Sequence, residues 1–370
     1  MGAKESEMNP TKRLHDIGQS LWVDNIDREM LASGTLRGYI DELSVTGLTS
    51  NPTIFDNAIG KGEAYDESIR KLHDEGKEGE DLFFALALED LREAADLFVA
   101  VHERTDGVDG WVSLEVSPRI ADDTEATIEQ VKELHEQSRR NNIFIKIPGT
   151  MAADKAIEES IYAGIPVNVT LLFSTDQYLA AAEAYMCGIE RRIEEGKDPE
   201  VASVASLFIS RWDKAVADEA PEELRSKLGI AVAQRTYRAY RELLDSDRWQ
   251  RLENEGARPQ RMLWASTGTK DPEASDVLYV EALAAPLTIN TMPDKTLLAF
   301  ADHGETGEHL SPDGGDSEQV LAAFNEAGID TDQLAKQLQK EGAETFVKSW
   351  GELLGTIDEK TRQVAAGSDA

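Results

Sequence analysis

The chain has 370 residues, 41% of them hydrophobic, enough to bury the core of one large α/β domain or of two smaller ones. Its 71 acidic and 38 basic residues leave a net charge of −33, which argues against nucleic acid and acidic membrane surfaces as partners. No apolar run approaches the roughly 20 residues of a membrane span, and the start has no apolar signal core. With Cys187 as the only cysteine, we expect a cytoplasmic protein in a reducing compartment and a buried structural thiol.

Short apolar segments alternate with long amphipathic ones, which is typical of βα units and a parallel sheet. A short helix is expected before about residue 19. Eight segments are predicted to be strands: residues 21–26, 44–50, 110–117, 143–148, 166–173, 201–209, 262–267 and 286–291. Eight strands, each followed by a helical pattern, predict a closed (β/α)8 TIM barrel. No Gly-rich dinucleotide loop follows the first strand and no Walker-type loop occurs, which counts against a doubly wound nucleotide-binding fold.

Helical patterns fill the intervals between the strands. Residues 125–139 place Ile128, Val131 and Leu134 on one stripe. Residues 152–162 follow Thr150 as an N-cap and end before Gly164. Long acidic helices are expected at residues 81–103 and 332–359, so the negative charge should lie on a solvated surface. We hypothesise that this charge is an adaptation to a salty cytoplasm.

After the last strand, residues 294–361 are expected to form helices interrupted by the loop 303–309. This loop, HGETGEH, contains two histidines and two glutamates, but its Gly-rich polar character disfavours a metal site. We therefore expect one domain over residues 1–370, with the barrel core at about 20–303 and a C-terminal helical extension at 304–370.

Lys146 is the most informative residue of the chain, because it is a lone cation in the apolar segment IFIKIPG at 143–149. In a strand it faces the same side as Phe144, opposite the three isoleucines. Burial of an ammonium is costly, and the usual relief is a lowered pKa, which leaves a neutral amine that attacks a carbonyl and forms a Schiff base. The alternative is a structural lysine that reaches solvent or pairs with a buried carboxylate.

Polar residues gather at the ends of seven of the predicted strands, where the active site of such a barrel lies. They are Asp24, Asn51, Glu115, Lys146, Asn168, Thr170, Ser206, Arg211 and Ser266. A single Asn, Thr or Ser at such a position is more often a hydrogen-bonded core residue, but the repetition at one end of the barrel favours a site. An amine for a ketone, two carboxylates, hydroxyls, amides and an arginine suited to phosphate describe a Schiff-base aldol enzyme that needs no metal or organic cofactor.

From about residue 21 to 303 the chain resembles the transaldolase family. The resemblance rests on six motifs in order: SNPTIF at 50–55, SLEVSPR at 113–119, DTEA at 123–126, IKIPGT at 145–150, NVTLLFS at 168–174 and TMPDKT at 291–296. It implies transfer of a dihydroxyacetone unit from sedoheptulose 7-phosphate to glyceraldehyde 3-phosphate, giving erythrose 4-phosphate and fructose 6-phosphate in the non-oxidative pentose phosphate pathway. Sugar phosphates are the implied partners, with no cofactor; a monomer and a homodimer both stay open.

The resemblance also implies roles for residues within these motifs. Lys146 matches the Schiff-base lysine, and Asp24 matches the base that accepts the C4 hydroxyl proton during cleavage. Glu115 and Thr170 match the pair that positions a catalytic water for formation and hydrolysis of the imine.

The remaining matches concern substrate binding. Asn51 and Asn168 match residues that hold the dihydroxyacetone unit, and Ser206 and Arg211 match one side of the phosphate site. On the other side many family members place an arginine after strand seven, where this chain reads ASTGTK at 265–270. We expect Lys270 to supply that charge, beside Ser266.

Two alternatives to a transaldolase stay open. One is a fructose-6-phosphate aldolase-like enzyme that releases dihydroxyacetone, because related barrels share the lysine; product formation without an acceptor aldehyde would distinguish it. The other is a catalytically silent sugar-phosphate binding protein. The joint presence of Asp24, Glu115, Lys146 and Thr170 argues against it, because binding alone does not need these four together.

Overall fold

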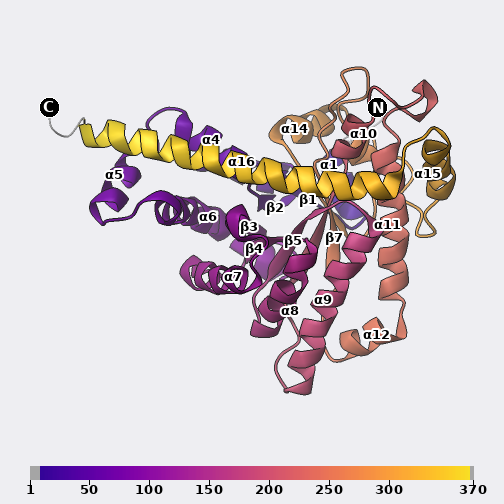
Figure 1. Ribbon diagram of the computed structural model, residues 1–370, viewed down its shortest axis with the longest axis horizontal. Helices are drawn as coiled ribbons and strands as arrows, with labels where there is room; N and C mark the ends of the chain where they lie inside the picture. The colour runs from indigo at the N-terminus through magenta and orange to yellow at the C-terminus, as the bar shows by residue number, and fades with distance from the viewer. Residues whose placement is uncertain (1–8, 367–370) are drawn as a thin grey trace, which may run out of the picture.

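The computed structural model describes residues 9–366, which contain a closed barrel of eight parallel strands in chain order (Figure 1). The strands are β1 Gln19–Asp24, β2 Val45–Thr49, β3 Trp111–Glu115, β4 Ile143–Pro148, β5 Val167–Leu172, β6 Ser203–Phe208, β7 Gln260–Ala265 and β8 Thr288–Met292. Each strand pairs with its neighbours in the chain, and β8 closes onto β1. The predicted (β/α)8 barrel is confirmed, and each strand lies within two residues of its predicted bounds.

Helices connect the strands and cover the outside of the barrel (Figure 1). The expected leading helix is α1 (Pro10–Asp16), whereas the preceding residues 1–8 lie outside the described residues. The connecting helices are α2 Arg28–Ala32, α3 Thr35–Glu42, α4 Pro52–Gly60, α5 Asp66–Asp74, α6 Gly79–Arg104, α7 Thr124–Ser138, α8 Asp154–Ala163, α9 Thr175–Glu194, α10 Ser210–Ala215, α11 Leu228–Leu244, α12 Asp247–Asn254 and α13 Leu278–Ala282. After β8 come α14 Asp294–His303, α15 Ser317–Glu326 and α16 Thr331–Ala366.

Local signals explain where several helices begin and end. The predicted stripe of α7, with Ile128 among its members, is buried, and the side chain of Asp123 caps the helix by accepting from the Ala126 N–H at 3.0 Å. The prediction of Thr150 as the N-cap of α8 was wrong, because a 3₁₀ turn at Met151–Ala153 intervenes and Thr150 makes no capping hydrogen bond. α8 does end at Gly164, whose φ of 86° suits glycine.

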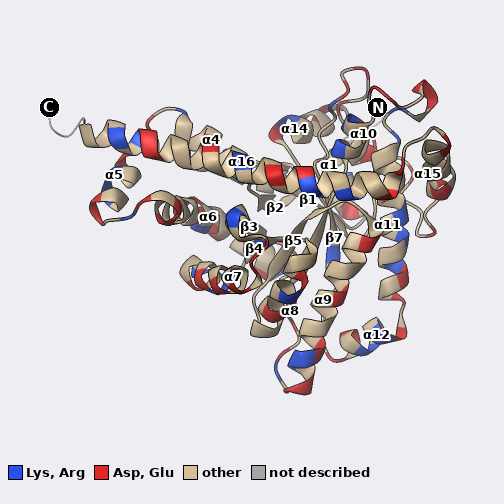
Figure 2. Ribbon diagram, viewed as in Figure 1, with Lys and Arg blue, Asp and Glu red and all other residues tan. Residues whose placement is uncertain are grey.

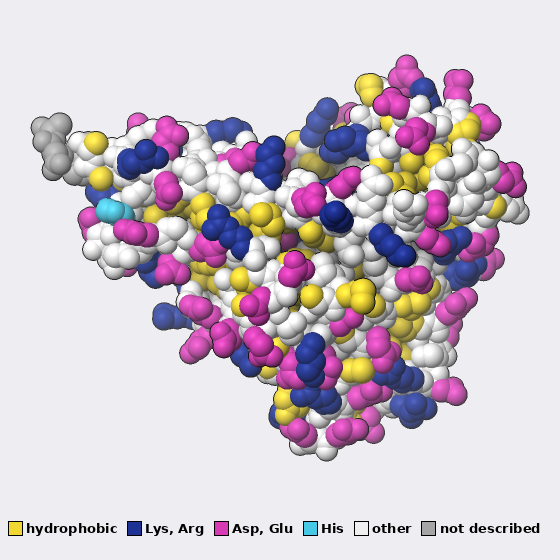
Figure 3. All heavy atoms as spheres, viewed as in Figure 1, with side chains coloured by type: hydrophobic (Ala, Val, Ile, Leu, Met, Phe, Trp, Pro, Cys, Tyr) yellow, Lys and Arg dark blue, Asp and Glu magenta, His cyan; other side chains and the backbone are white. Residues whose placement is uncertain are grey.

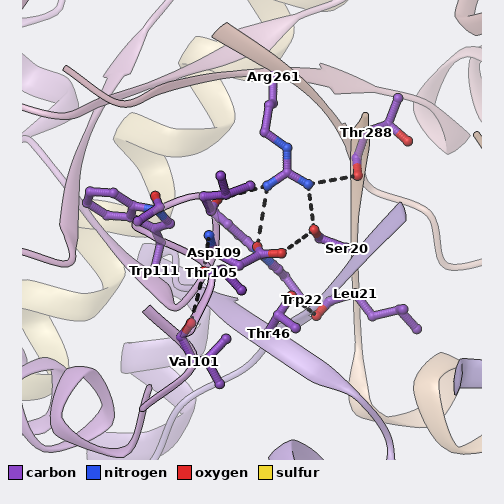
Figure 4. A network of polar contacts seen from close by, with 12 residues as sticks. Ser20, Leu21, Trp22, Thr46, Val101, Thr105, Asp109, Trp111, Arg261 and Thr288 are labelled. Atoms are coloured by element: carbon purple, nitrogen blue, oxygen red, sulfur yellow. Dashed lines mark hydrogen bonds and ion pairs between the residues drawn. The ribbon is translucent and has the colours of Figure 1, made fainter. Parts of the chain in front are cut away.

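The amino end of the barrel is closed by aromatic rings and a buried polar network. Phe144 stacks on Trp111 with ring centroids 4.2 Å apart. Asp109 accepts hydrogen bonds from Ser20 and from the Trp22 indole N–H and pairs with Arg261 at 3.4 Å, as Figure 4 shows. Because this carboxylate is satisfied on several sides, the network holds the barrel bottom together and leaves the opposite end for chemistry.

The long helix α16 crosses the barrel and packs on α4, α5 and α6 (Figure 1). The indole of Trp350 is buried, donates to Glu80 Oε1 at 2.7 Å and lies 5.0 Å from the Phe83 ring centroid. Further along, Thr356 donates to Asp56 of α4 at 2.6 Å. The C-terminal extension is thus joined to the barrel helices over much of its length.

Charged side chains are distributed along the helices, as expected from the composition (Figure 2). On the face that α16 crosses, acidic and basic side chains are interspersed with small apolar areas (Figure 3). Both expected acidic helices are present, as α6 and α16, and carry exposed acidic residues such as Glu93. Within residues 9–366, no helix combines the length and the apolar character that crossing a membrane requires.

The prediction of a buried thiol at Cys187 was wrong. The residue lies in α9, as expected for the helical run around it, but its side chain is only half-buried. The sulfur lies 3.4 Å from Glu183 and 3.7 Å from the guanidinium of Arg248, because this side of α9 faces the charged residues of α12.

Candidate active site

A cavity of about 360 Å³ opens at the carboxyl ends of the strands. Eight of the ten residues selected from the sequence line it: Asp24, Asn51, Lys146, Thr170, Ser206, Arg211, Ser266 and Lys270. The other two, Glu115 and Asn168, are buried next to it, in contact with Lys146 and Ser206 respectively. The barrel brings these residues together because its parallel strands all end at the same side.

Lys146 lies near the end of β4 and is 6% exposed. Its ammonium donates to the backbone carbonyl of Ser50 at 3.1 Å and lies 3.6 Å from Glu115 Oε2. The lysine therefore has a buried carboxylate partner, as the alternative of a structural lysine expected. It also lines the cavity, which a purely structural ion pair does not require.

Glu115 ends β3 and is 4% exposed. Neither carboxylate oxygen has a hydrogen-bond partner among the described residues. Burial raises the pKa of Glu115 to about 7, against the lowering effect of Lys146, while the charge of Asp24 raises it further. A carboxyl group that titrates near neutral pH is suited to both accept and donate a proton.

Thr170 lies in β5, and its buried hydroxyl has no hydrogen-bond partner within residues 9–366. The next residue, Leu171, has a φ of 60°, in the left-handed region. The pairing of β5 with β6 shifts register between Val169 and Leu172, so the strand bulges at this point. Bulges of this kind redirect side chains and are frequent beside active sites.

Asp24 ends β1 on the other side of the cavity and is half-buried. Its carboxylate accepts a hydrogen bond from Thr49 at 2.7 Å, and the Thr49 hydroxyl is in turn 2.6 Å from that of Thr291. Burial raises the pKa of Asp24; Thr49 and Lys146 oppose this shift and Asp294 adds to it. Asp24 therefore holds its proton more strongly than an exposed aspartate and is a stronger base when ionised.

The two predicted asparagines differ in their surroundings. Asn51 is the N-cap of α4, and its Oδ1 accepts from the Ile54 N–H at 3.1 Å, which leaves its amide N–H groups for a ligand in the cavity. Asn168 is fully buried: its Oδ1 accepts from Ser206 at 2.7 Å and its Nδ2 lies 3.3 Å from the Ser113 hydroxyl. It supports the floor of the site.

Two cations face one side of the cavity. Arg211, at the start of α10, is half-buried and lies 5.2 Å from the Phe208 ring centroid; burial lowers the pKa of its guanidinium. Lys270 is exposed at the rim. Neither forms an ion pair within the described part of the chain, so this side of the cavity is suited to an anion.

Ser266 lies one residue beyond β7, so the prediction that it belongs to the strand was wrong by one position. Its φ of 56° turns the chain out of the strand direction, and its hydroxyl lies 2.9 Å from that of Ser210. Ser266 lines the cavity together with Ser206 and Lys270.

The sequence did not reveal every residue of the cavity. Thr49 and Phe208 lie on predicted strands, and Thr291 is the first residue of the motif TMPDKT. Their positions in the sequence could therefore have indicated that they belong to the site. Thr345, Phe346 and Ser349 come from α16. The spacing of Gly342, Phe346 and Trp350 indicates that one face of α16 is buried. The spacing does not indicate which part of the protein covers that face.

The loop with two histidines does not contribute to the cavity. His303 is the last residue of α14 and pairs with Asp276 at 2.9 Å and with Asp302 at 3.3 Å. These two acids, Asp276 first, raise the pKa of His303.

Comparison with known proteins gives one consistent result. Residues 21–357 match the family model described as transaldolase/fructose-6-phosphate aldolase. A transaldolase of Saccharopolyspora erythraea is 44% identical over 357 residues, covering 95% of this chain and 97% of that protein. A transaldolase of Thermobifida fusca is 44% identical, covering 97% and 99%, and one of Mycolicibacterium smegmatis is 45% identical, covering 92% and 94%. The family match continues past the last sequence motif into α16.

Proposed function

The chain belongs to the transaldolase/fructose-6-phosphate aldolase family, and from that premise we propose how its barrel performs the reaction. It is an enzyme of the transaldolase class. It transfers a dihydroxyacetone unit from sedoheptulose 7-phosphate to glyceraldehyde 3-phosphate through a lysine Schiff base, giving erythrose 4-phosphate and fructose 6-phosphate in the non-oxidative pentose phosphate pathway. The observation that carries the assignment of the site is Lys146, buried at the cavity beside Glu115.

In the proposed first step, the amine of Lys146 attacks the C2 carbonyl carbon of the ketose. The resulting carbinolamine hydroxyl takes a proton and leaves as water, which gives a protonated imine. Glu115 and Thr170 are proposed to hold this water and exchange its proton. Within residues 9–366 the side-chain oxygens of Glu115 and Thr170 accept no hydrogen bond, and the pKa of Glu115 is about 7; both observations support this role.

Asp24 is the proposed base for carbon–carbon cleavage. It takes the proton of the C4 hydroxyl; the C3–C4 bond then breaks, its electron pair moves into the imine, and the aldose leaves while a three-carbon enamine stays on Lys146. Its raised pKa and its hydrogen bond from Thr49 support a base held in a fixed orientation. The acceptor aldehyde then reacts by the reverse of these steps.

The remaining site residues are proposed to bind the sugar phosphate. Asn51 holds the hydroxyls of the three-carbon unit, and Asn168 supports it from below through Ser206. Arg211 and Lys270, together with Ser266, receive the phosphate; the lack of ion pairs at both cations within residues 9–366 supports this.

A borohydride trapping experiment tests the proposal. Incubation with fructose 6-phosphate, reduction, digestion and mass spectrometry should find a three-carbon adduct on Lys146, with erythrose 4-phosphate released. An adduct on another lysine would overturn the assignment, and substrate binding with no adduct would favour the silent binding protein. Dihydroxyacetone release without any acceptor aldehyde, at a rate equal to transfer, would favour the aldolase.

We also propose that the chain works as a single domain in the cytoplasm, as a monomer or a homodimer and without nucleic acid or membrane partners. The close packing of α16 on α4, α5 and α6 supports a single unit. The strong negative charge supports the absence of nucleic acid. Light scattering of the purified protein would distinguish the monomer from the dimer.

A further inference from the structure

One side chain of α16 reaches the ends of two barrel strands. The amide nitrogen of Gln339 donates to the backbone carbonyl of Gly149, just after β4, at 2.8 Å, and to that of Leu171, in β5, at 3.1 Å. Lys146 lies on the first of these strands and Thr170 on the second. Gln339 does not line the cavity.

The carbonyl of Leu171 belongs to the bulge of β5. A leucine with a φ of 60° occupies a sparsely populated conformation, which persists only where its surroundings hold it. β5 and β6 change register at this point, and here the Leu171 carbonyl accepts a hydrogen bond from Gln339. The bulge directs the preceding residue, Thr170, so whatever holds the bulge also orients the Thr170 hydroxyl.

The second contact of Gln339 reaches Thr170 through Gly149. The Gly149 N–H donates to the Thr170 carbonyl at 2.7 Å, while the Gly149 carbonyl accepts from Gln339. A Cβ on Gly149 would lie 2.4 Å from Leu172 Cδ2 and 3.2 Å from the Thr170 carbonyl oxygen. A side chain at position 149 would therefore force Leu172 to move. Gln339, directly and through Gly149, holds the two peptide groups that flank Leu171, the residue after Thr170.

The packing of α16 against the barrel places Gln339 at this position. One turn along the helix, a Cβ on Gly342 would lie 3.1 Å from Leu171 Cδ2 and 3.3 Å from Arg211 Nη1, so the helix backbone rests on the bulge. The buried Trp350 anchors the helix further along. The family match extends over this part of α16, to residue 357.

We propose that Gln339 is a positioning residue of the active site, which holds the β5 bulge and thereby orients the hydroxyl of Thr170. The proposal rests on the role proposed above for Thr170 in handling the catalytic water. The tail helix then contributes to imine formation and hydrolysis without contacting the substrate through this residue. Loss of the two hydrogen bonds should slow turnover and leave phosphate binding unchanged.

A double-mutant cycle in the full-length protein tests this proposal. Gln339→Met keeps the length of the side chain and removes both donors. The matched control is Gln337→Met, at an exposed position of the same helix, where the side-chain amide donates to Glu341 at 2.8 Å. Both changes are introduced into the parent and into Thr170→Val, and kcat and KM for glyceraldehyde 3-phosphate are measured.

We expect Gln339→Met to lower kcat by about tenfold with KM changed less than about twofold, and Gln337→Met to leave both unchanged. In the Thr170→Val background, Gln339→Met should lower kcat by less than about twofold further. A full additional tenfold loss there overturns the inference while leaving the role of Thr170 intact. Full activity of Thr170→Val overturns both the proposed role of Thr170 and this inference.

A second variant keeps the test decisive if Gln339→Met does not fold. Gln339→Glu places a carboxyl opposite two carbonyl oxygens, where it donates only when protonated. Relative to the parent, its kcat should therefore fall as pH rises. A parallel pH profile for parent and variant would contradict the requirement for a donor at this position.

Discussion

The carboxylate of Glu115 lies 3.6 Å from the amine of Lys146, and both side chains are almost completely buried at the end of neighbouring strands. The strand register places them opposite each other, since Glu115 of β3 pairs with Lys146 of β4. A carboxyl group in this position meets two opposing influences: burial favours its protonated form, and the lysine favours its charged form.

Replacing Lys146 tests the chemistry directly. Lys146→Ala should abolish transfer, because no other lysine among the described residues lies on a barrel strand in the cavity. Lys295→Ala is the matched control, since this exposed lysine lies in another family motif and outside the cavity. Coupled assay of erythrose 4-phosphate release would measure both. Transfer by Lys146→Ala at more than roughly a few per cent of the parent rate would contradict the assignment.

The raised pKa of Glu115 predicts a specific dependence of stability on pH. Its pKa is about 7 in the folded state and near the ordinary value of 4.5 when unfolded, so the folded state binds more protons between these values. The free energy of unfolding should therefore fall as pH rises from about 4.5 to 7, by up to about 3 kcal/mol from this group. In Glu115→Gln that part of the slope should disappear, as urea unfolding at several pH values would show.

Asp96→Asn is the control for the dependence of unfolding on pH. Asp96 is an exposed carboxylate whose pKa is lowered by its hydrogen bonds with Arg140. Asp96→Asn should leave the slope between pH 4.5 and 7 as in the parent. Equal slopes for the parent and Glu115→Gln would mean that Glu115 titrates at an ordinary pKa in the folded protein.

Arg211 is predicted to recognise phosphate rather than the sugar. Arg211→Met should lower kcat/KM for glyceraldehyde 3-phosphate by about 10²-fold, because the proposed charge-assisted contact with the phosphate is removed. For unphosphorylated glyceraldehyde as acceptor the change should be small. Lys270→Met removes an exposed charge at the rim of the cavity. It should also lower kcat/KM more for the phosphorylated acceptor than for glyceraldehyde, but by a smaller factor than Arg211→Met. Equal losses with both acceptors would argue against a phosphate contact.

Trp350 is predicted to hold the tail helix on the barrel. Trp350→Ala removes a fully buried ring and leaves Glu80 without its indole donor, so it should lower the free energy of unfolding by about 3–5 kcal/mol. Val347→Ala on the same helix, where the side chain is 43% exposed, should change it by less than about 0.5 kcal/mol. Urea unfolding of both variants measures the difference. A small effect at Trp350 would mean that the other contacts of α16 hold it in place.

The acidic surface predicts a dependence of stability on salt. With a net charge of −33, screening should reduce self-repulsion, so the thermal midpoint should rise from low to molar potassium chloride. Sorbitol at matched osmolality serves as the control for general solvent effects. An unchanged midpoint would remove the support for adaptation to a salty cytoplasm.

Much of the site followed from local patterns in the sequence. The strand at residues 143–148 was recognisable because its isoleucines alternate with Phe144 and Lys146, and a period of two residues decides which side chains point inward. Asp24 and Glu115 end their strands, and in a barrel of parallel strands all such ends meet.

Other features depend on contacts between distant segments. Gln339 bonds to Gly149 across 190 residues, and Phe346 of α16 lines the cavity. The amphipathic pattern of α16 indicates that one face is buried, but the pattern is the same whether that face covers the barrel, a second copy or a separate domain. The pKa of Glu115 likewise depends on burial and on the distance to Lys146.

The sequence by itself determined the barrel, the inward direction of Lys146 and the end of the barrel at which the chemistry lies, because strand alternation and βα order are local properties of the chain. The tertiary structure alone decided that the tail helix forms part of the cavity wall and that Gln339 holds the bulge beside Thr170. Such contacts arise from how distant surfaces fit when the chain is compact, and no local periodicity specifies them.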